Sequence, residues 1–219
     1  MTTLQQIGHL LRWEFKAELR QPAAVGSVLL YITVTTTIVY LALRTFTADT
    51  FNALLWVVLF FGSLVATGRS FLREGGRRHL YYYQLTSPEA LLGAKLIYNT
   101  VLIWIVSGLS YALLALFARE RFLTSTPVFL AAVGLGGLGL AGVLSFVAAI
   151  SARAGGNGTL MAVLSLPLLT PLLYLLISLG DVAFGVDEDP VQTVISYLIA
   201  IDLIIVAVAI ALFAGVWRD

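Results

Sequence analysis

The chain has 219 residues, of which 59% are hydrophobic and 11% are charged, and its formal net charge is +1. Soluble globular domains are about half apolar and about one quarter charged, so this composition indicates an integral membrane protein and excludes a sizeable soluble domain. The sequence contains no cysteine, which excludes disulfides, thiolate metal sites and cysteine nucleophiles.

Residues 3–21 are predicted to form an amphipathic helix that ends before Pro22. Its apolar face is made by side chains at spacings of three and four: Leu4, Ile7, Leu10, Leu11, Trp13, Phe15 and Leu19. A basic line recurs at intervals of four, at Arg12, Lys16 and Arg20, and an acidic line runs beside it, at Glu14 and Glu18. The helix either lies in the headgroup layer, with its basic line on lipid phosphates, or packs on another part of an assembly. We favour the headgroup layer, which makes the basic line the predicted membrane-interface site.

Six apolar runs follow, at about 23–43, 53–68, 95–117, 127–151, 159–179 and 193–216. Most of them reach the roughly 20 residues that a helix needs to cross a hydrocarbon core of about 30 Å. Lipid offers the backbone no hydrogen-bond partners, so runs of this length are predicted to be helices. The second run is short, and we expect either that its helix continues through Leu72 or that Arg69 snorkels. The predicted fold is an all-α membrane protein with a single permease domain, residues 1–219, in which six transmembrane helices follow an interfacial helix.

The distribution of Lys and Arg predicts the orientation. If the N-terminus is cytoplasmic, ten of the thirteen basic residues lie on that side, and the other side holds Arg44, Arg119 and Arg121. Cytoplasmic loops carry the excess of basic residues. Both termini are therefore predicted to be cytoplasmic.

Residues 69–94 are the longest polar interruption between two membrane-length runs. They contain a Gly75-Gly76 break, the cluster Arg77-Arg78-His79 and three consecutive tyrosines, before Ser87-Pro88-Glu89 opens another helix. The predicted topology places them in the cytoplasm. We interpret them as a coupling segment, the surface on which a partner protein pushes.

Two spans carry unusual residues. Pro167 and Pro171 each remove a backbone donor, so their helix is expected to kink or break, either as a harmless bend or as a gate or re-entrant element near the outer surface. Asp202 is the only carboxylate well inside a span, where an ionised acid costs several kcal/mol. It is expected to be protonated, hydrogen-bonded to a Tyr, Ser or Thr, or facing water, with a role in gating or as a contact within the bundle.

Residues 134–139 match the dinucleotide-binding pattern G-x-G-x-x-G. They lie in an apolar span with no preceding strand, so a dinucleotide site is rejected. Gly137, Ala141 and Ser145 instead predict a small-residue ridge that lets two helices approach closely.

Catalytic motifs are missing from the sequence. The two histidines, His9 and His79, lie in polar segments, and the sequence has neither an H-E-x-x-H motif nor a P-loop. The chain is predicted to be no enzyme, with no catalytic or metal site, no directly bound cofactor and no nucleic-acid partner.

The coupling segment, taken with the fourth and fifth spans, resembles the permease of the cytochrome c maturation system, the CcmB family of haem exporter proteins, which is an ABC-2 or type V exporter-like permease. The resemblance is carried by R-W-E-F-K at 12–16, Glu74-Gly75, Leu85 with Ser87-Pro88, Lys95, and the proline pair 167 and 171. Export permeases of the wider ABC-2 class share the N-terminal elbow helix and the acidic-glycine loop, whereas the length and the span count favour CcmB. The chain departs from the family pattern at Arg77-Arg78-His79 and at the three tyrosines.

The resemblance implies a bacterial inner-membrane permease that works with three other proteins of the maturation system: a separate ATPase, a haem-handling membrane protein and a small accessory protein. ATP would be bound by the ATPase, and haem is a possible substrate of the complex. Contacts with the ATPase are expected at Arg73, Glu74, Arg77, Arg78, Tyr81, Tyr82 and Tyr83. The complex would either export haem or release a haem-loaded chaperone, and the lack of histidine in the spans favours release. The alternatives are an ABC-2 permease for a lipid or polysaccharide and a membrane scaffold without transport.

Overall fold

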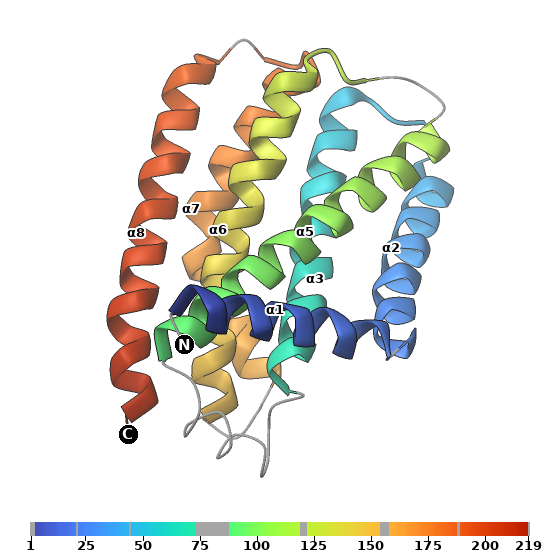
Figure 1. Cartoon of the computed structure of the whole chain (residues 1–219). Coiled ribbons are helices and arrows are strands. Elements are labelled where there is room, and N and C mark those ends of the chain that lie inside the picture. Colours follow the sequence, from blue (N-terminus) through green and yellow to red (C-terminus); the bar gives the residue numbers. More distant parts are fainter. Residues whose placement is uncertain are drawn as a thin grey trace.

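The computed structural model describes residues 3–20, 22–43, 45–72, 88–118, 122–153, 158–187 and 189–218, and in these ranges all regular structure is helical. The helices are α1 (Thr3–Leu19), α2 (Pro22–Leu43), α3 (Ala48–Leu72), α5 (Pro88–Ala118), α6 (Thr126–Arg153), α7 (Gly158–Ala183) and α8 (Val191–Arg218) (Figure 1). Among the described residues, the six helices after α1 are long and apolar enough to cross a membrane. The predicted all-α membrane fold is confirmed.

The helices extend a few residues beyond the apolar runs at several ends. The second span is the clearest case, because α3 continues to Leu72 as predicted. Continuing the helix satisfies backbone groups that would otherwise lie unpaired at the membrane surface.

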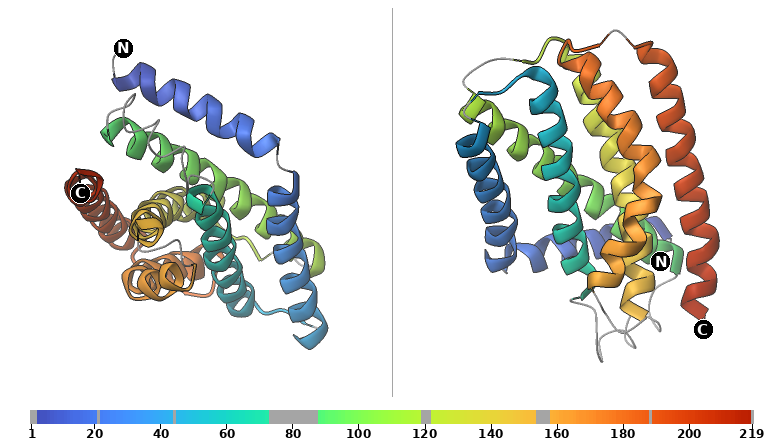
Figure 2. Two further views of the ribbon diagram at one scale, coloured as in Figure 1. Left: turned by 90° about the horizontal axis from the view of Figure 1, so that it is seen from below. Right: turned by 180° about the vertical axis from the view of Figure 1, so that it is seen from behind.

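The elbow helix α1 crosses the bundle near one of its ends, while α2, α3, α6, α7 and α8 run along it (Figure 1). Both chain termini lie at this end, which we call the terminal end; the opposite end, with the α2–α3, α5–α6 and α7–α8 connections, is the distal end. Seen from below, α1 lies alongside the first part of α5 (Figure 2, left). The packing of α1 on α5 therefore positions the elbow helix.

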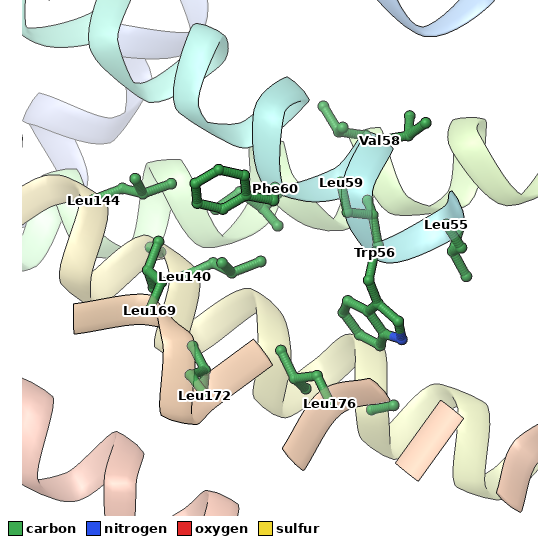
Figure 3. Close-up of a cluster of buried hydrophobic side chains, with 14 of the residues drawn as sticks. Leu55, Trp56, Val58, Leu59, Phe60, Leu140, Leu144, Leu169, Leu172 and Leu176 are labelled. Atoms are coloured by element: carbon green, nitrogen blue, oxygen red, sulfur yellow. The ribbon is translucent and has the colours of Figure 1, made fainter. Parts of the chain in front are cut away.

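The apolar core lies where α3, α6 and α7 meet (Figure 3). Each helix contributes one stripe of fully or almost fully buried side chains: Leu55, Trp56 and Leu59 from α3, Leu140 and Leu144 from α6, and Leu169, Leu172 and Leu176 from α7. Lipid is as apolar as these side chains, so close packing rather than burial from water holds such a core together.

The predicted small-residue ridge on α6 is confirmed as a packing surface. A Cβ on Gly137 would collide with the indole of Trp104 from α5. Four residues on, Ala141 is fully buried, and the hydroxyl of Ser145 accepts a hydrogen bond of 2.7 Å from the amide of Asn99, also on α5. Small side chains let α5 and α6 approach closely enough for that bond to form.

At the distal end, aromatic rings from several segments pack together. The ring of Phe51 lies 5.2 to 5.9 Å, centroid to centroid, from the rings of Tyr111, Phe122 and Phe184. Two backbone bonds of 3.0 Å, from Thr124 and Ser125 to the carbonyl of Ala183, join the start of α6 to the end of α7. Gly185 follows with a φ of +71°, a conformation that glycine adopts without steric cost.

Pro167 and Pro171 do not break their helix, because α7 is continuous from Gly158 to Ala183 and contains both. The expectation of a break or a re-entrant element is wrong. A proline in a helix removes one hydrogen bond but leaves the rest of the ladder in place, and in membranes the remaining bonds keep the segment helical.

Candidate coupling site at the elbow helix

The elbow helix is held to α5 first by apolar contacts. Leu10 of α1 is buried with Leu91 and Ala94 of α5, and Ile7 and Leu11 pack against the same cluster. These α1 residues recur at spacings of three and four, so they occupy one stripe of the helix. The stripe contacts the first turns of α5, where the coupling segment ends.

A buried ion pair extends this contact. The Nζ atom of Lys95 on α5 pairs with Oε1 of Glu14 on α1, and their side chains are only 2% and 6% exposed. Glu14 follows Leu10 by four residues, which puts its carboxylate on the inward stripe of α1. Each buried charge is paired with the other, and removing one partner would take this compensation away from the other.

A second polar contact lies one turn further along both helices. The hydroxyl of Tyr98 donates a 2.8 Å hydrogen bond to Oε2 of Glu18, and the rings of Tyr98 and Phe15 meet edge to face at 5.3 Å. Glu14 and Glu18 are four apart on α1, and Lys95 and Tyr98 are three apart on α5. The two contacts therefore fix both the position and the orientation of α1, and we call these four residues the elbow clamp.

The elbow clamp continues into the bundle. Asn99 directly follows Tyr98 and is itself buried, and its amide donates to Ser145 on α6. One turn of α5 thus makes polar contacts with α1 on one side and with α6 on the other. A displacement of this turn would move both neighbours, because hydrogen bonds and packed side chains transmit it directly.

The predicted basic line faces away from the elbow clamp. Arg12, Lys16 and Arg20 are exposed, whereas Glu14 is buried. At 100° per residue, the basic line lies on the side of α1 opposite the inward stripe. The helix thus does pack on another part of the chain, and its basic side stays open to an anionic surface; contact with lipid headgroups remains a prediction.

The predicted ATPase contacts lie outside the described residues. This holds for Arg73, Glu74, Arg77, Arg78, Tyr81, Tyr82 and Tyr83 alike. The helices α3 and α5 bracket them, ending at Leu72 and beginning at Pro88. The coupling segment therefore leads directly into the part of α5 that carries the elbow clamp.

The predicted intramembrane residues lie apart from the elbow clamp. Pro167 and Pro171 are exposed on α7, and Asp202 is buried on α8 against Gly139 of α6 and Leu172 of α7. A Cβ on Gly139 would collide with Oδ1 of Asp202, so the glycine makes room for the carboxyl group.

Neither carboxyl oxygen of Asp202 has a hydrogen-bond partner in the described part of the chain. Among the described residues, the expected hydrogen bond to a Tyr, Ser or Thr is not found, and the side chain of Asp202 is buried. The uncharged form is the one that such an apolar position tolerates.

The sequence shows the charged residues of the elbow clamp, but it does not show that they contact one another. Glu14 and Glu18 form an acidic line on the first helix, and Lys95 begins the third apolar run, but nothing in the sequence shows that these segments touch. The one available signal is charge complementarity. The first helix carries two acidic residues on one line, and a single lysine at the start of the third span is a possible partner for them.

No group of three or more His, Asp or Glu side chains suited to hold a metal ion occurs among the described residues.

The arrangement of the elbow clamp is suited to mechanical coupling. A helix lies across the bundle, and an ion pair and a hydrogen bond hold it to α5, the helix that comes after the long polar stretch of the chain.

A multi-pass membrane protein with an elbow helix is the class that this fold and this site define. The model of the family described as "CcmB protein" matches residues 5–217, and the chain belongs to this family. It is therefore a membrane component of the ABC system for cytochrome c maturation and haem export. Comparisons with curated proteins and with solved structures found no match.

Proposed function

We propose that this chain couples ATP hydrolysis by a separate ATPase to haem export or to release of a haem-loaded chaperone. The elbow clamp is the observation that carries the proposal. It joins α1 to the first turns of α5, the helix in which the coupling segment ends. Force applied to the segment would reach α1 and α5 together.

The proposed cycle is mechanical. Closure of the ATPase dimer pushes on the coupling segment, and Glu74 with Arg77 and Arg78 makes the charged contacts while the three tyrosines supply apolar anchors. The elbow clamp makes α1 follow α5, and the Asn99–Ser145 bond passes the displacement to α6. Helices that move as rigid bodies about packed interfaces are an established mode of switching. Pro167, Pro171 and Asp202 stay predicted gating residues in this cycle.

The proposed orientation places the terminal end in the cytoplasm. Both termini lie at that end (Figure 1), and so do the end of α3 and the start of α5, between which residues 73–87 run. The basic side of α1 then faces the anionic inner leaflet of the bacterial inner membrane. The proposed partners are the ATPase, the haem-handling membrane protein and the small accessory protein of the maturation system.

The proposal is tested by purification of the tagged chain in mild detergent with its companion proteins, followed by an ATPase assay and a haem absorbance scan. We expect the ATPase to co-purify and cytochrome c assembly to require the chain. Glu74→Lys should leave the chain inserted while ATP hydrolysis no longer supports assembly. Normal cytochrome c levels in that variant would refute the contact, and a complex with a lipid or polysaccharide but no haem-handling partner would favour the alternative export permease.

A further inference from the structure

The last helix, α8, contacts the rest of the bundle through one narrow strip of side chains. Val194, Leu198, Asp202 and Ala209 are buried, and Ile205 packs against the core. Their close spacings of three and four residues put them on one side of the helix. α8 lies at the edge of the bundle and packs on α5, α6 and α7 (Figures 1 and 2). We call these five residues the α8 strip, and a carboxyl group lies at its centre.

The α8 strip fits against two glycines of α6. A Cβ on Gly139 would collide with Oδ1 of Asp202, and a Cβ on Gly142 would lie 2.7 Å from Cγ2 of Ile205. The two glycines are three residues apart, and so are their partners on α8, so the helices match over about one turn. Leu172 of α7 borders the same place, because its methyl groups would lie 2.8 and 2.9 Å from a Cβ on Gly139. We call Gly139, Gly142 and Leu172 the α8 seat.

The carboxyl group of Asp202 has no polar neighbour in the α8 seat. Its side chain is 7% exposed, and neither oxygen has a hydrogen-bond partner in the part of the chain that the structure describes. Buried polar groups are normally hydrogen-bonded, so one without a partner calls for an explanation. An apolar side chain at this position would complete the strip without the cost of burying a polar group. Packing alone therefore does not explain the acid.

The charged and titratable residues of α6 and α7 lie away from Asp202. The one charged residue of α6 is Arg153, the last of the helix, 14 positions from Gly139 and so about 21 Å along the axis. On α7, Tyr174 is exposed, and Asp181 accepts from Asn52 at the distal end. Neither helix thus places a counter-charge at the α8 seat.

The titratable residues of α5 and of α8 itself also lie elsewhere. On α5, Glu89 is the second residue of the helix, Lys95 and Tyr98 contact α1, and Tyr111 packs in the distal aromatic cluster. On α8, Tyr197 is exposed and Arg218 is the last residue. Among the described side chains, none that could compensate a negative charge faces Asp202.

The charge of Asp202 therefore depends on whether α8 is in its seat. In the seat nothing compensates a carboxylate, so the neutral, protonated form is strongly favoured. In water a carboxyl group is ionised at neutral pH. A group that binds a proton in one position and releases it in another links proton binding to the movement between them.

We propose that Asp202 is a proton-binding site and that the bound proton holds α8 in its seat. Release of the proton to water leaves a carboxylate that the α8 seat does not tolerate, so α8 moves out of the seat and brings Asp202 toward water. Binding of a proton neutralises the group and returns the helix. The inference goes beyond the proposed function because it needs no ATPase, and within the proposed cycle it names the ligand of a predicted gating residue.

The chain has no cysteine, so one introduced pair can report whether α8 is in its seat. A Cβ on Gly142 would lie 4.0 Å from the Cβ of Ile205, within the separation of about 3.5–4.5 Å that a disulfide bridges. The double variant Gly142→Cys with Ile205→Cys is therefore expected to form its disulfide while α8 is seated. The yield is measured on the full chain in lipid nanodiscs after mild oxidation and blocking of the remaining thiols.

This cysteine pair is compared with and without Asp202→Asn, in buffers from mildly acidic to alkaline. Thiols react as thiolates, so alkali changes the yield by itself, and the Asp202→Asn background measures that effect alone because its residue 202 stays uncharged. We expect equal yields in acid and a several-fold lower yield in alkali for the chain that keeps Asp202. A ratio of the two yields that does not change with pH would overturn the inference.

Infrared spectroscopy tests proton binding directly, because a protonated carboxyl group absorbs apart from a carboxylate. The difference spectrum between the chain and its Asp202→Asn variant should show the protonated band in neutral buffer and lose it in alkali. Absence of that band in neutral buffer would show that Asp202 holds no proton in the seat, and the inference would fail.

The α8 seat is tested with the same cysteine pair. Gly139→Ala places a methyl group against the carboxyl of Asp202, so we expect a several-fold lower disulfide yield at every pH. Gly134→Ala on the same helix is the matched control and should leave the yield unchanged, because nothing lies within 4 Å of its added Cβ. Equal yields from the two variants would contradict the seat.

These measurements use the chain without its companions. Their failure would leave the proposed coupling to an ATPase intact. Failure of the ATPase to co-purify would in turn leave the proton site intact.

Discussion

The two ends of the bundle are held together by different kinds of interaction. At the terminal end, a buried ion pair and a tyrosine–carboxylate bond fasten α1 to α5. At the distal end, the amide of Asn52 on α3 donates to the carbonyl of Ile177 and to Oδ1 of Asp181 on α7, at 2.8 and 2.7 Å, beside the aromatic cluster around Phe51. The distal end thus combines these hydrogen bonds with packed rings from several segments, whereas the terminal end fastens α1 to α5 by an ion pair, a hydrogen bond and a small apolar cluster.

This difference suggests which end moves. Closely packed rings have few alternative arrangements, so the distal end is suited to be a fixed point. The elbow clamp instead ties one surface helix to one span, so α1 and α5 can shift as a unit, and the Asn99–Ser145 bond passes that shift to α6. We expect displacement at the terminal end and little change at the distal end during the proposed cycle.

The largest effect should come from breaking the elbow clamp. Lys95→Met removes the positive charge that pairs with the buried carboxylate of Glu14, and breaking a buried ion pair costs about 3–5 kcal/mol. We expect a marked fall in the unfolding temperature in detergent and loss of cytochrome c assembly. The double variant Glu14→Lys with Lys95→Glu should recover much of the stability, and Glu18→Gln, which keeps an acceptor for Tyr98, should cost far less. Equal damage from Glu18→Gln and Lys95→Met would show that charge pairing is not the determinant.

A smaller but clear effect is expected at the distal end. Asn52→Leu removes both hydrogen bonds between α3 and α7 and leaves the Asp181 carboxylate without its amide donor, which costs about 1–3 kcal/mol. The unfolding temperature should fall, while ATPase stimulation by the remaining folded protein should stay normal because the site lies away from the coupling segment. Loss of stimulation in folded Asn52→Leu protein would mean that the distal end is no fixed point.

The link between α5 and α6 should contribute less. Ser145→Ala removes the acceptor of the Asn99 amide, and interhelical hydrogen bonds in membrane proteins are worth about 0.6 kcal/mol on average. We expect a small fall in stability but a measurable loss of coupling between ATP hydrolysis and cytochrome c assembly. Ser107→Ala on α5, whose hydroxyl donates to the Ile103 carbonyl of its own helix, is the matched control. Identical behaviour of the two variants would remove Ser145 from the proposed path.

The smallest effect is expected at Asp202. An uncharged carboxyl group and an amide have nearly the same size, so Asp202→Asn should change stability by less than about 0.5 kcal/mol. Unfolding in detergent measures the stability of the variant, and the yield of cytochrome c measures its activity. A large loss of activity at unchanged stability would support the predicted gating role of Asp202 and show that this role needs the acidic proton.

The sequence alone determined the number and type of the membrane-spanning helices, because a helix must satisfy its own backbone in lipid and long apolar runs leave no other solution. It also identified the small-residue ridge that starts at Gly137, because small side chains at intervals of four let two helices in a membrane approach closely. Only the tertiary structure decided that Glu14 meets Lys95, that Pro167 faces outward and that Asp202 lies against Gly139. Such contacts join segments far apart in the chain, and local patterns carry the chemistry of each partner but not the packing that brings them together.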